Sequence, residues 1–334
     1  MNVFIDPRFD RVYGRYPLVL ADIGARGGLK KNWLAARRHL RVLGFEPDKH
    51  EFGRLVDRTG GEAHPDTFFD VALHNRPGRV PLHVARDRGL SSIFEPNRAF
   101  LDTFPDAARF DTVDRHDVDA DTLDNLLAAH QIDDLDFIKA DTQGSELYVL
   151  EGADRALASS VVGVEVEVEF TPIYTGQPLF AEVDAFLRER GYLLFDLRPC
   201  YWKRAVGRGI GGPRGQIIWA DALYLKNVTA LRATVARLDS ERRQSKLLRA
   251  LSIALLYGYA DYALQITGDL RDLWTAGEGA GIEQRLRAYA DPQGSLPKFP
   301  GRRHLAAALR RLWERCREPH EAWSISDADL GNLE

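Results

Sequence analysis

An apolar stretch that runs directly into a glycine-rich turn restricts the fold of this chain more than any other feature. Leu18–Ala21 is continuously apolar, as expected for a parallel strand covered on both faces, and Asp22 follows it at the end of the expected strand. Three glycines come next: Gly24, Gly27 and Gly28. They allow positive φ angles and close approach of a ligand to the backbone, and residues 29–39 then have helical composition. A strand, a glycine turn and a helix start together predict a nucleotide-type binding site.

The spacing of this turn narrows the kind of ligand. It follows the pattern D-x-G-x-x-G-G and departs from the dinucleotide fingerprint G-x-G-x-x-G, because Arg26 stands where that fingerprint has its second glycine. Asp22 at the strand end disfavours a pyrophosphate and favours a ligand with an ammonium group, such as S-adenosylmethionine (SAM). Glycine turns after strands are common in α/β proteins, so further residues must support this interpretation.

Strands and helices alternate over the first two thirds of the chain, which predicts an α/β fold with a doubly wound, mostly parallel sheet. The further expected strands span residues 40–45, 67–73, 79–84, 135–141, 161–170, 192–197 and 216–225.

Two positions near the ends of the second and third expected strands suit an adenosine group. Glu46 follows the second strand, about 20 positions beyond the glycine turn, where a doubly wound sheet places a carboxylate that accepts hydrogen bonds from ribose hydroxyls. Ala72, at the end of the third strand, is small and apolar enough to lie against a flat adenine ring, although the same character suits a core position.

Carboxylates are unusually dense on two neighbouring expected strands. Glu165, Glu167 and Glu169 alternate with valines and therefore share one face of their strand. We expect Glu165 to form a buried ion pair with Lys139 on the adjacent strand. Glu167 and Glu169 lie with Asp141 near the carboxyl ends of these strands, where open α/β sheets bind ligands. Such a cluster suits a general base or a divalent metal, and the sequence does not separate the two, so no metal site is predicted.

Composition excludes several classes of protein. The 334 residues are 45% hydrophobic and 28% charged, with a formal net charge of -4, which gives no electrostatic reason to expect a nucleic-acid partner. Two cysteines, Cys200 and Cys316, make a disulfide framework or a cysteine-rich zinc site untenable. No stretch has the length and apolar character of a signal peptide or a membrane helix, so we expect a soluble, cytoplasmic protein.

The composition becomes helical after Asn227, which predicts two parts: an α/β domain over residues 1–226 and an all-α extension over residues 227–334. The last expected helix, residues 302–317, carries Leu305, Leu309, Leu312, Trp313 and Cys316 on one face, opposite several arginines. We expect this face to pack on the core; a helix lying on a membrane surface is the alternative. The extension is also a candidate homodimer interface.

Together these residues resemble the FkbM-type family of SAM-dependent methyltransferases. The similarity lies in LADIGARGG, GFEPD, LDFIKADTQGSELYVLEGA, VEVEFTPIYTGQPLFAEVDAFLRERGYLLFDL and the later DALYLK, and it extends from residue 18 to about residue 226. It implies the class I methyltransferase fold, a Rossmann-like, seven-stranded sheet whose last strand is antiparallel. Many family members have valine and glutamate where this chain has Thr142 and Gln143.

The resemblance also implies methyl transfer from SAM, commonly to a hydroxyl of a sugar, a glycan or a natural product. The positions of the residues agree with this activity. Asp22, Gly24, Gly27 and Gly28 would hold the amino-acid end of SAM, and Glu46 would hold its ribose. Asp141, also a candidate contact of the cofactor, would face the acceptor with Glu167 or Glu169. Two other hypotheses stay open: a nicotinamide-dependent sugar-modifying enzyme, and a catalytically idle scaffold that acts through its helical tail.

Overall fold

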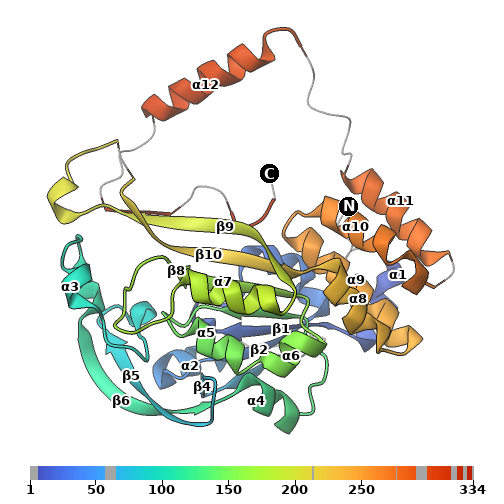
Figure 1. The fold of residues 1–334 in the computed structure, drawn as a ribbon, viewed down its shortest axis with the longest axis horizontal. Helices are drawn as coiled ribbons and strands as arrows, with labels where there is room; N and C mark the ends of the chain where they lie inside the picture. Colours follow the sequence, from blue (N-terminus) through green and yellow to red (C-terminus); the bar gives the residue numbers. More distant parts are fainter. Residues whose placement is uncertain are drawn as a thin grey trace.

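A mixed sheet forms the centre of the computed structural model, which describes residues 7–56, 65–212, 214–275, 277–290, 299–316, 322–325 and 329–332. The strand order is β11-β9-β10-β8-β7-β1-β2-β3. Figure 1 labels β9, β10, β8, β1 and β2 of this sheet. The strands are β1 (Leu18–Ile23), β2 (Leu40–Phe45), β3 (Thr67–Phe69), β7 (Phe137–Ala140), β8 (Gly163–Glu169), β9 (Tyr192–Trp202), β10 (Gln216–Lys226) and β11 (Trp323–Ile325).

Seven strands of this sheet, in the spatial order β3-β2-β1-β7-β8-β10-β9, confirm the expected class I topology. β1 pairs in parallel with β2 on one side and with β7 on the other. Next outward, β2 pairs in parallel with β3, and β7 pairs in parallel with β8. β10 is antiparallel to both of its neighbours, β8 and β9. The order changes direction between β1 and β7, so the carboxyl ends of these two strands flank the point where open α/β sheets bind ligands. β11, from the C-terminal extension, adds an eighth strand on the β9 edge.

A second, three-stranded sheet has the order β4-β6-β5. The expected third strand is divided, because β3 ends at Phe69 and β4 (Ala72–Leu73) pairs with β6 in this second sheet. β5 (Gly78–Ala85) forms an antiparallel ladder with β6 (Thr112–Asp121). Most of β6 is exposed and rich in aspartate, so the sequence carries no apolar alternation that would predict it as a strand.

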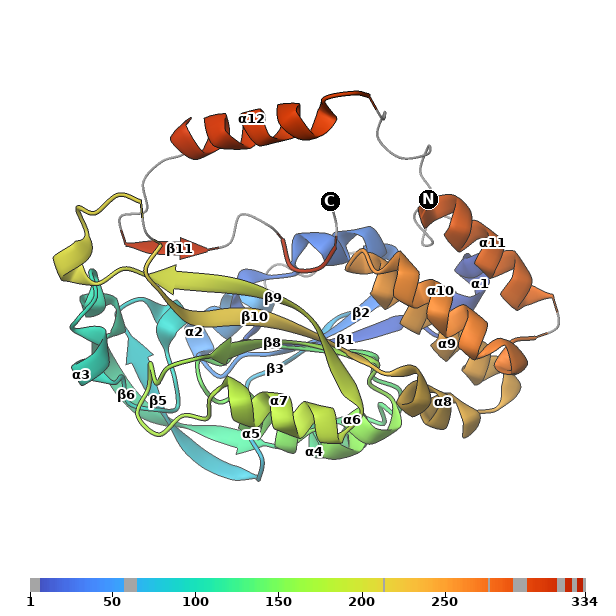
Figure 2. The ribbon, with the colours of Figure 1, turned by 45° about the horizontal axis from the view of Figure 1, so that its top comes forward.

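Helices cover both faces of the main sheet (Figure 2). One face packs on α4 (Leu123–Ala129), α5 (Glu146–Glu151), α6 (Asp154–Ser159) and α7 (Phe180–Glu189). The other face packs on the 3-10 segment η3 (Lys31–His39) and on α8 (Val228–Ala236), α9 (Ser240–Leu256) and α10 (Ala260–Asp269). Side chains of β1 alternate between the two faces. Leu18 and Leu20 pack on the side of α8, α9 and α10, and Val19 and Ala21 pack on the side of α4 to α7.

The remaining helices lie toward the periphery: α1 (Pro7–Arg15), α2 (Lys49–Val56), α3 (Arg98–Leu101) and α11 (Glu278–Ala290). Short 3-10 segments occur at η2 (Ala25–Gly27), η4 (Arg88–Leu90), η5 (Ala107–Phe110), η6 (Ala205–Gly207) and η7 (Arg271–Leu273).

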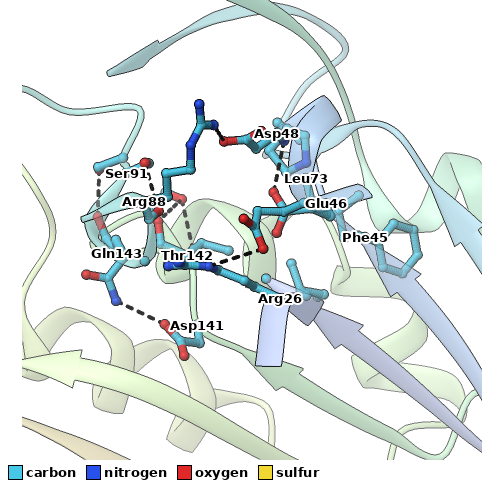
Figure 3. Close-up of a pocket in the computed structure, with 18 of the residues that line it drawn as sticks. Arg26, Phe45, Glu46, Asp48, Leu73, Arg88, Ser91, Asp141, Thr142 and Gln143 are labelled. Carbon is cyan, nitrogen blue, oxygen red and sulfur yellow. Dashed lines mark hydrogen bonds and ion pairs between the residues drawn. The ribbon is translucent and has the colours of Figure 1, made fainter. Parts of the chain in front are cut away.

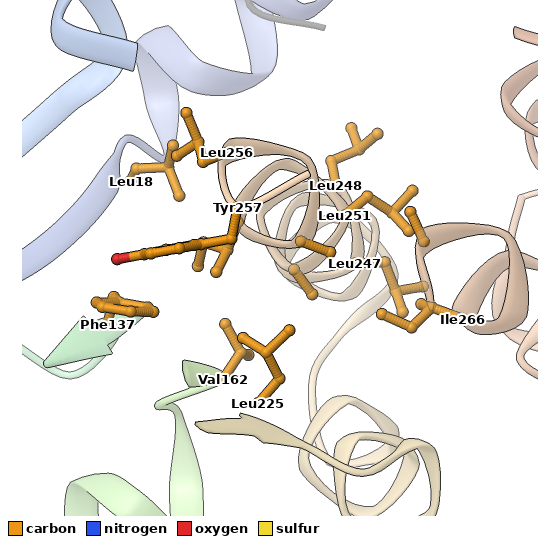
Figure 4. Packing of buried hydrophobic residues seen from close by; sticks show 14 of the residues in the cluster. Leu18, Phe137, Val162, Leu225, Leu247, Leu248, Leu251, Leu256, Tyr257 and Ile266 are labelled. Carbon is orange, nitrogen blue, oxygen red and sulfur yellow. The ribbon is translucent and has the colours of Figure 1, made fainter. Parts of the chain in front are cut away.

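The helical extension shares a core with the sheet. Leu247, Leu251 and Tyr257 of the α9 region belong to the same buried cluster as Leu18 and Phe137 (Figure 4). The Tyr257 ring stacks on that of Phe137, with ring centroids 5.5 Å apart. This contact joins the extension to β7, which pairs with the strand that precedes the glycine turn. The division of the chain at residue 226 stays a prediction.

A buried ion network adds to the same junction. Lys246 and Arg249 of α9 are both about 1% exposed, and both pair with Asp134 and Asp136. Asp136 also accepts a hydrogen bond from the backbone N–H of Val19, at 2.9 Å. The network therefore fixes α9 to the amino ends of β1 and β7.

The expected packing of the last helix is wrong. In α12 (Arg302–Cys316), the exposed fractions of Leu305, Leu309, Leu312 and Trp313 lie between 50% and 59%. An amphipathic pattern shows which face of a helix is apolar, but it does not specify which surface covers that face. None of the described helices combines the length and apolar character needed to cross a membrane.

Candidate functional site

A cavity of about 460 Å³ opens at the carboxyl ends of β1, β2 and β7 (Figure 3). Five of the residues predicted for the site line it: Gly24, Gly28, Glu46, Ala72 and Asp141. Its volume lies within the range of roughly 300–1,000 Å³ that is typical of small-molecule pockets. One wall comes from the segment that contains η4, including Arg88, Gly89 and Ser91.

Glycine is required at the first position of the turn. Gly24 has a φ of 73°, and a Cβ atom there would lie 2.0 Å from the carbonyl oxygen of Asp141. Its N–H donates to the carbonyl of Phe45 at 3.0 Å, so the turn is held against the ends of both neighbouring strands. Gly28, at the other end of η2, has the same φ of 73°. Gly27 is the last residue of η2. The turn thus presents bare backbone to the cavity.

Glu46 is a buried carboxylate on the cavity wall. It is 8% exposed, and its Oε1 accepts a hydrogen bond from the N–H of Asp48 at 2.9 Å. Burial raises the pKa of Glu46 to about 7, with Asp48 and Glu51 adding to the effect. Arg88 forms an ion pair with Asp48 at the cavity rim (Figure 3). Glu46 is therefore poised to change charge near neutral pH.

Asp22 is buried behind the turn, and its immediate partner is a lysine. Lys139 Nζ lies 3.2 Å from Asp22 Oδ1 and 3.8 Å from Asp141 Oδ2. The predicted ion pair between Lys139 and Glu165 is wrong, although the two residues are register partners. Glu165 instead pairs with Lys30 and accepts a 2.6 Å hydrogen bond from the Tyr257 hydroxyl. Lys139 is drawn toward the two aspartates at the strand ends.

Gln143 joins two of the predicted carboxylates, and the sequence offered no reason to choose it. Its Nε2 donates to Asp141 Oδ1 at 3.0 Å and to Glu167 Oε1 at 2.8 Å. The backbone of Gln143 has a φ of 57°, which is uncommon for a residue other than glycine. Ser92 Oγ donates to the Gln143 carbonyl at 2.6 Å, and the Tyr174 hydroxyl lies 3.0 Å from its Oε1. These contacts fix the amide between the two acids.

Glu167 and Glu169 do not belong to the described cavity lining; they lie behind Asp141 with Glu146. One carboxylate oxygen from each of the three glutamates lies within 4.8 Å of the others. Burial raises the pKa of Glu167 and Glu169 well above the usual carboxyl range, and that of Glu146 to about 7. Glu146 accepts the N–H groups of Thr142 and Gly144, so it also holds the turn after β7.

The apolar end of the cavity lies at Ala72. Ala72 is 6% exposed, and Val71, Leu73, Phe45 and Leu82 join it in the lining. A flat apolar ring fits such a surface, whereas the opposite end holds the glycine turn and Asp141.

Comparisons with known proteins show which family the chain belongs to. No match was found among curated proteins. A precorrin-6y C5,15-methyltransferase from Geobacter metallireducens is 13% identical, with 67% of this chain and 91% of that chain covered and a TM-score of 0.32. A magnesium protoporphyrin IX methyltransferase from Synechocystis with bound SAM is 10% identical, with 66% and 78% covered and a TM-score of 0.32. The Methyltransferase FkbM domain matches residues 22–194, more than half of the chain. The chain therefore belongs to the FkbM family of SAM-dependent methyltransferases.

Proposed function

We propose that this chain is an O-methyltransferase that transfers the methyl group of SAM to a hydroxyl of a sugar, a glycan or another natural product. The observation that carries the proposal is the convergence of Gly24, Glu46 and Asp141 on one cavity at the carboxyl ends of three parallel strands. In this arrangement bare backbone, a carboxylate for the ribose and a carboxylate for the acceptor proton would surround one small-molecule pocket.

The lining residues would accommodate SAM along its whole length. The bare backbone at Gly24 and Gly28 leaves room for the amino-acid portion, and a Cβ at Gly24 would collide with Asp141. Asp22 would contribute negative charge from behind the turn, in company with Lys139. Glu46, when ionised, would accept hydrogen bonds from the ribose hydroxyls, and the surface at Ala72 would cover the adenine.

Asp141 would act on the acceptor. Bound SAM supplies an electrophilic methyl group to the attacking oxygen. Asp141 would accept the hydroxyl proton at a carboxylate oxygen while the acceptor oxygen gains the methyl group and S-adenosylhomocysteine leaves, so that a methyl ether would be the product. Gln143 would hold Asp141 in position through its 3.0 Å hydrogen bond.

Glu167 and Glu169 would assist from behind Asp141. With Glu146 they offer carboxylate oxygens of the kind that a hard divalent cation binds, and in the absence of a cation their raised pKa values favour shared protons. Whether they hold a cation or share protons, the three glutamates would determine the net charge next to Asp141 while Asp141 accepts a proton. Turnover measured with and without a chelator separates the two forms.

The test begins with SAM binding measured by calorimetry, followed by an acceptor screen with SAM labelled with ¹³C in the methyl group. We expect tight SAM binding and label attached to oxygen in a sugar or natural-product acceptor. Asp141→Asn should lower turnover at least about 100-fold while SAM affinity changes less than threefold, as for loss of a general base. Glu189→Gln, at a side chain 78% exposed on α7, is the matched control.

Three results would refute the proposal. Binding of a nicotinamide dinucleotide without SAM would favour the sugar-modifying oxidoreductase. Binding of SAM with no acceptor methylated across the screen would favour the idle scaffold. Label found only on nitrogen or carbon would retain a methyltransferase but remove the O-methyl assignment.

A further inference from the structure

The end of the C-terminal extension returns to the methyltransferase sheet through one tryptophan. Trp323 in β11 is paired in register with Trp202 of β9, and the two rings stack with centroids 4.3 Å apart. The stack lies in an apolar cluster with Phe104 and Phe110. Trp323 is thus fixed against the main domain by both its backbone and its ring.

Arg109 connects this tryptophan to Asp87, which directly precedes the cavity-lining Arg88. Its guanidinium carbon lies 4.4 Å from the centre of the Trp323 ring. The same guanidinium donates to Asp87 Oδ2 from NH2 at 2.7 Å and from Nε at 3.3 Å. The Asp87 N–H in turn donates to the Arg109 carbonyl at 3.0 Å. Hydrogen bonding to Arg109 is the main cause that lowers the pKa of Asp87, so the carboxylate is held in its charged form.

Asp87 orders the segment that forms one wall of the cavity. Its Oδ1 accepts the N–H of Gly89 at 3.2 Å and so caps η4, whose Arg88 and Gly89 line the cavity. The same oxygen lies 3.7 Å from Arg26 NH1 in the glycine turn. A Cβ at Gly89 would lie 2.2 Å from that NH1 atom, so the wall and the turn are in direct contact. A single carboxylate therefore links both sides of the cavity mouth.

We propose that Trp323 and Arg109 are positioning residues for the cofactor pocket: the C-terminal strand holds Arg109, Arg109 orients Asp87, and Asp87 fixes the η4 wall against the glycine turn. The ligand affected is SAM, so this inference rests on the proposed function. It assigns the extension a role in cofactor binding, although none of the described residues of the extension lines the cavity.

The size of the effect follows from the contacts. Arg109 and Asp87 are only partly buried, with side chains 43% and 36% exposed, so each interaction is modest. Loss of the ring contact in Trp323→Leu should weaken SAM binding about two- to fivefold. Loss of both contacts in Arg109→Met should weaken it about fivefold or more. The double variant should bind SAM no more weakly than Arg109→Met, because Trp323 acts through Arg109.

The experiment uses the full chain and two readouts. Calorimetry measures SAM affinity, and hydrogen exchange of the unliganded protein measures protection of the amides of residues 86–93. Arg204→Met is the matched control, because its guanidinium carbon also lies 4.4 Å from a ring of the same cluster, that of Phe104, but bonds to Gln216 rather than to Asp87. We expect faster exchange and weaker binding in Trp323→Leu and Arg109→Met, and neither change in Arg204→Met.

The outcomes separate this inference from the proposed function. If the unaltered chain binds no SAM, the proposed function fails, and exchange at residues 86–93 alone decides whether the contacts order the wall. If the chain binds SAM and both variants match it in affinity and exchange, the inference is overturned. It is equally overturned if Arg204→Met produces the same losses, because the effect would then be a general loosening of the aromatic cluster.

Discussion

Ionised Glu46 is expected to strengthen SAM binding but to lower the free energy of unfolding. Burial raises its pKa from 4.5 to about 7, so above neutral pH the folded protein carries a charge that its surroundings disfavour. Glu46→Gln removes this charge and keeps an amide oxygen that can accept the N–H of Asp48, now 2.9 Å from Oε1. The substitution should therefore stabilise the fold and weaken cofactor binding.

The magnitude and sign follow from proton linkage. The folded state binds the Glu46 proton more tightly than the unfolded state, so the free energy of unfolding falls as pH rises from 4.5 to 7 and is constant above. A difference of about 2.5 pKa units corresponds to roughly 3 kcal/mol at pH 8, which is the upper bound on the gain from Glu46→Gln. At pH 5 the gain should be below about 1 kcal/mol.

SAM affinity should show the opposite pH dependence. With a pKa of about 7, the ionised fraction of Glu46 rises about tenfold between pH 6 and pH 8, and SAM affinity should rise with it. In Glu46→Gln this rise should disappear. The assays are urea unfolding at pH 5 and pH 8 and calorimetry at pH 6 and pH 8, with Glu189→Gln as the exposed control.

A variant that is less stable at pH 8, or equally stabilised at both pH values, would refute the reasoning about burial. Retention of the tenfold rise in Glu46→Gln would refute the ribose assignment.

Three further changes test other parts of the structure. Lys246→Met removes one of the two cations that pair with the buried Asp136 and leaves Arg249 as the other, so it should lower the free energy of unfolding by about 3 kcal/mol in urea titrations. Arg242→Met, at an exposed pair, should cost less than about 1 kcal/mol. Gly24→Ala should abolish SAM binding in calorimetry, because its Cβ would meet the Asp141 carbonyl; Gly53→Ala, with open space around the added Cβ, should leave binding intact. Gln143→Leu should reduce kcat about tenfold with SAM affinity unchanged, in assays with the acceptor found in the screen; an unchanged kcat would remove its positioning role.

The local patterns predicted much of the sheet and one end of the site. β1 and β2 lie close to where the apolar runs predicted them, because strands with both faces buried are encoded locally. The glycine spacing predicted the bare turn, and Gly24 does adopt a conformation that disfavours other residues. The resemblance to the FkbM family then predicted the topology, and the antiparallel β10 confirms it.

Partners between distant segments could not be predicted in the same way. Strand periodicity showed that Glu165 and Lys139 share a face, but it did not show that Lys30 would reach Glu165 or that Asp22 would attract Lys139. Gln143 had no distinguishing pattern either, because its function in the site depends on two acids that come together only when β7 and β8 are adjacent.

The sequence by itself determined the fold family, the glycine turn and the acidic character of the strand ends, because each depends on neighbouring residues along the chain. Only the tertiary structure decided which charges pair, that the apolar face of α12 is half exposed, and that Trp323 returns to the edge of the sheet. Pairing energies depend on distances between side chains that the chain brings together from far apart, and those distances follow from the packing of the whole molecule.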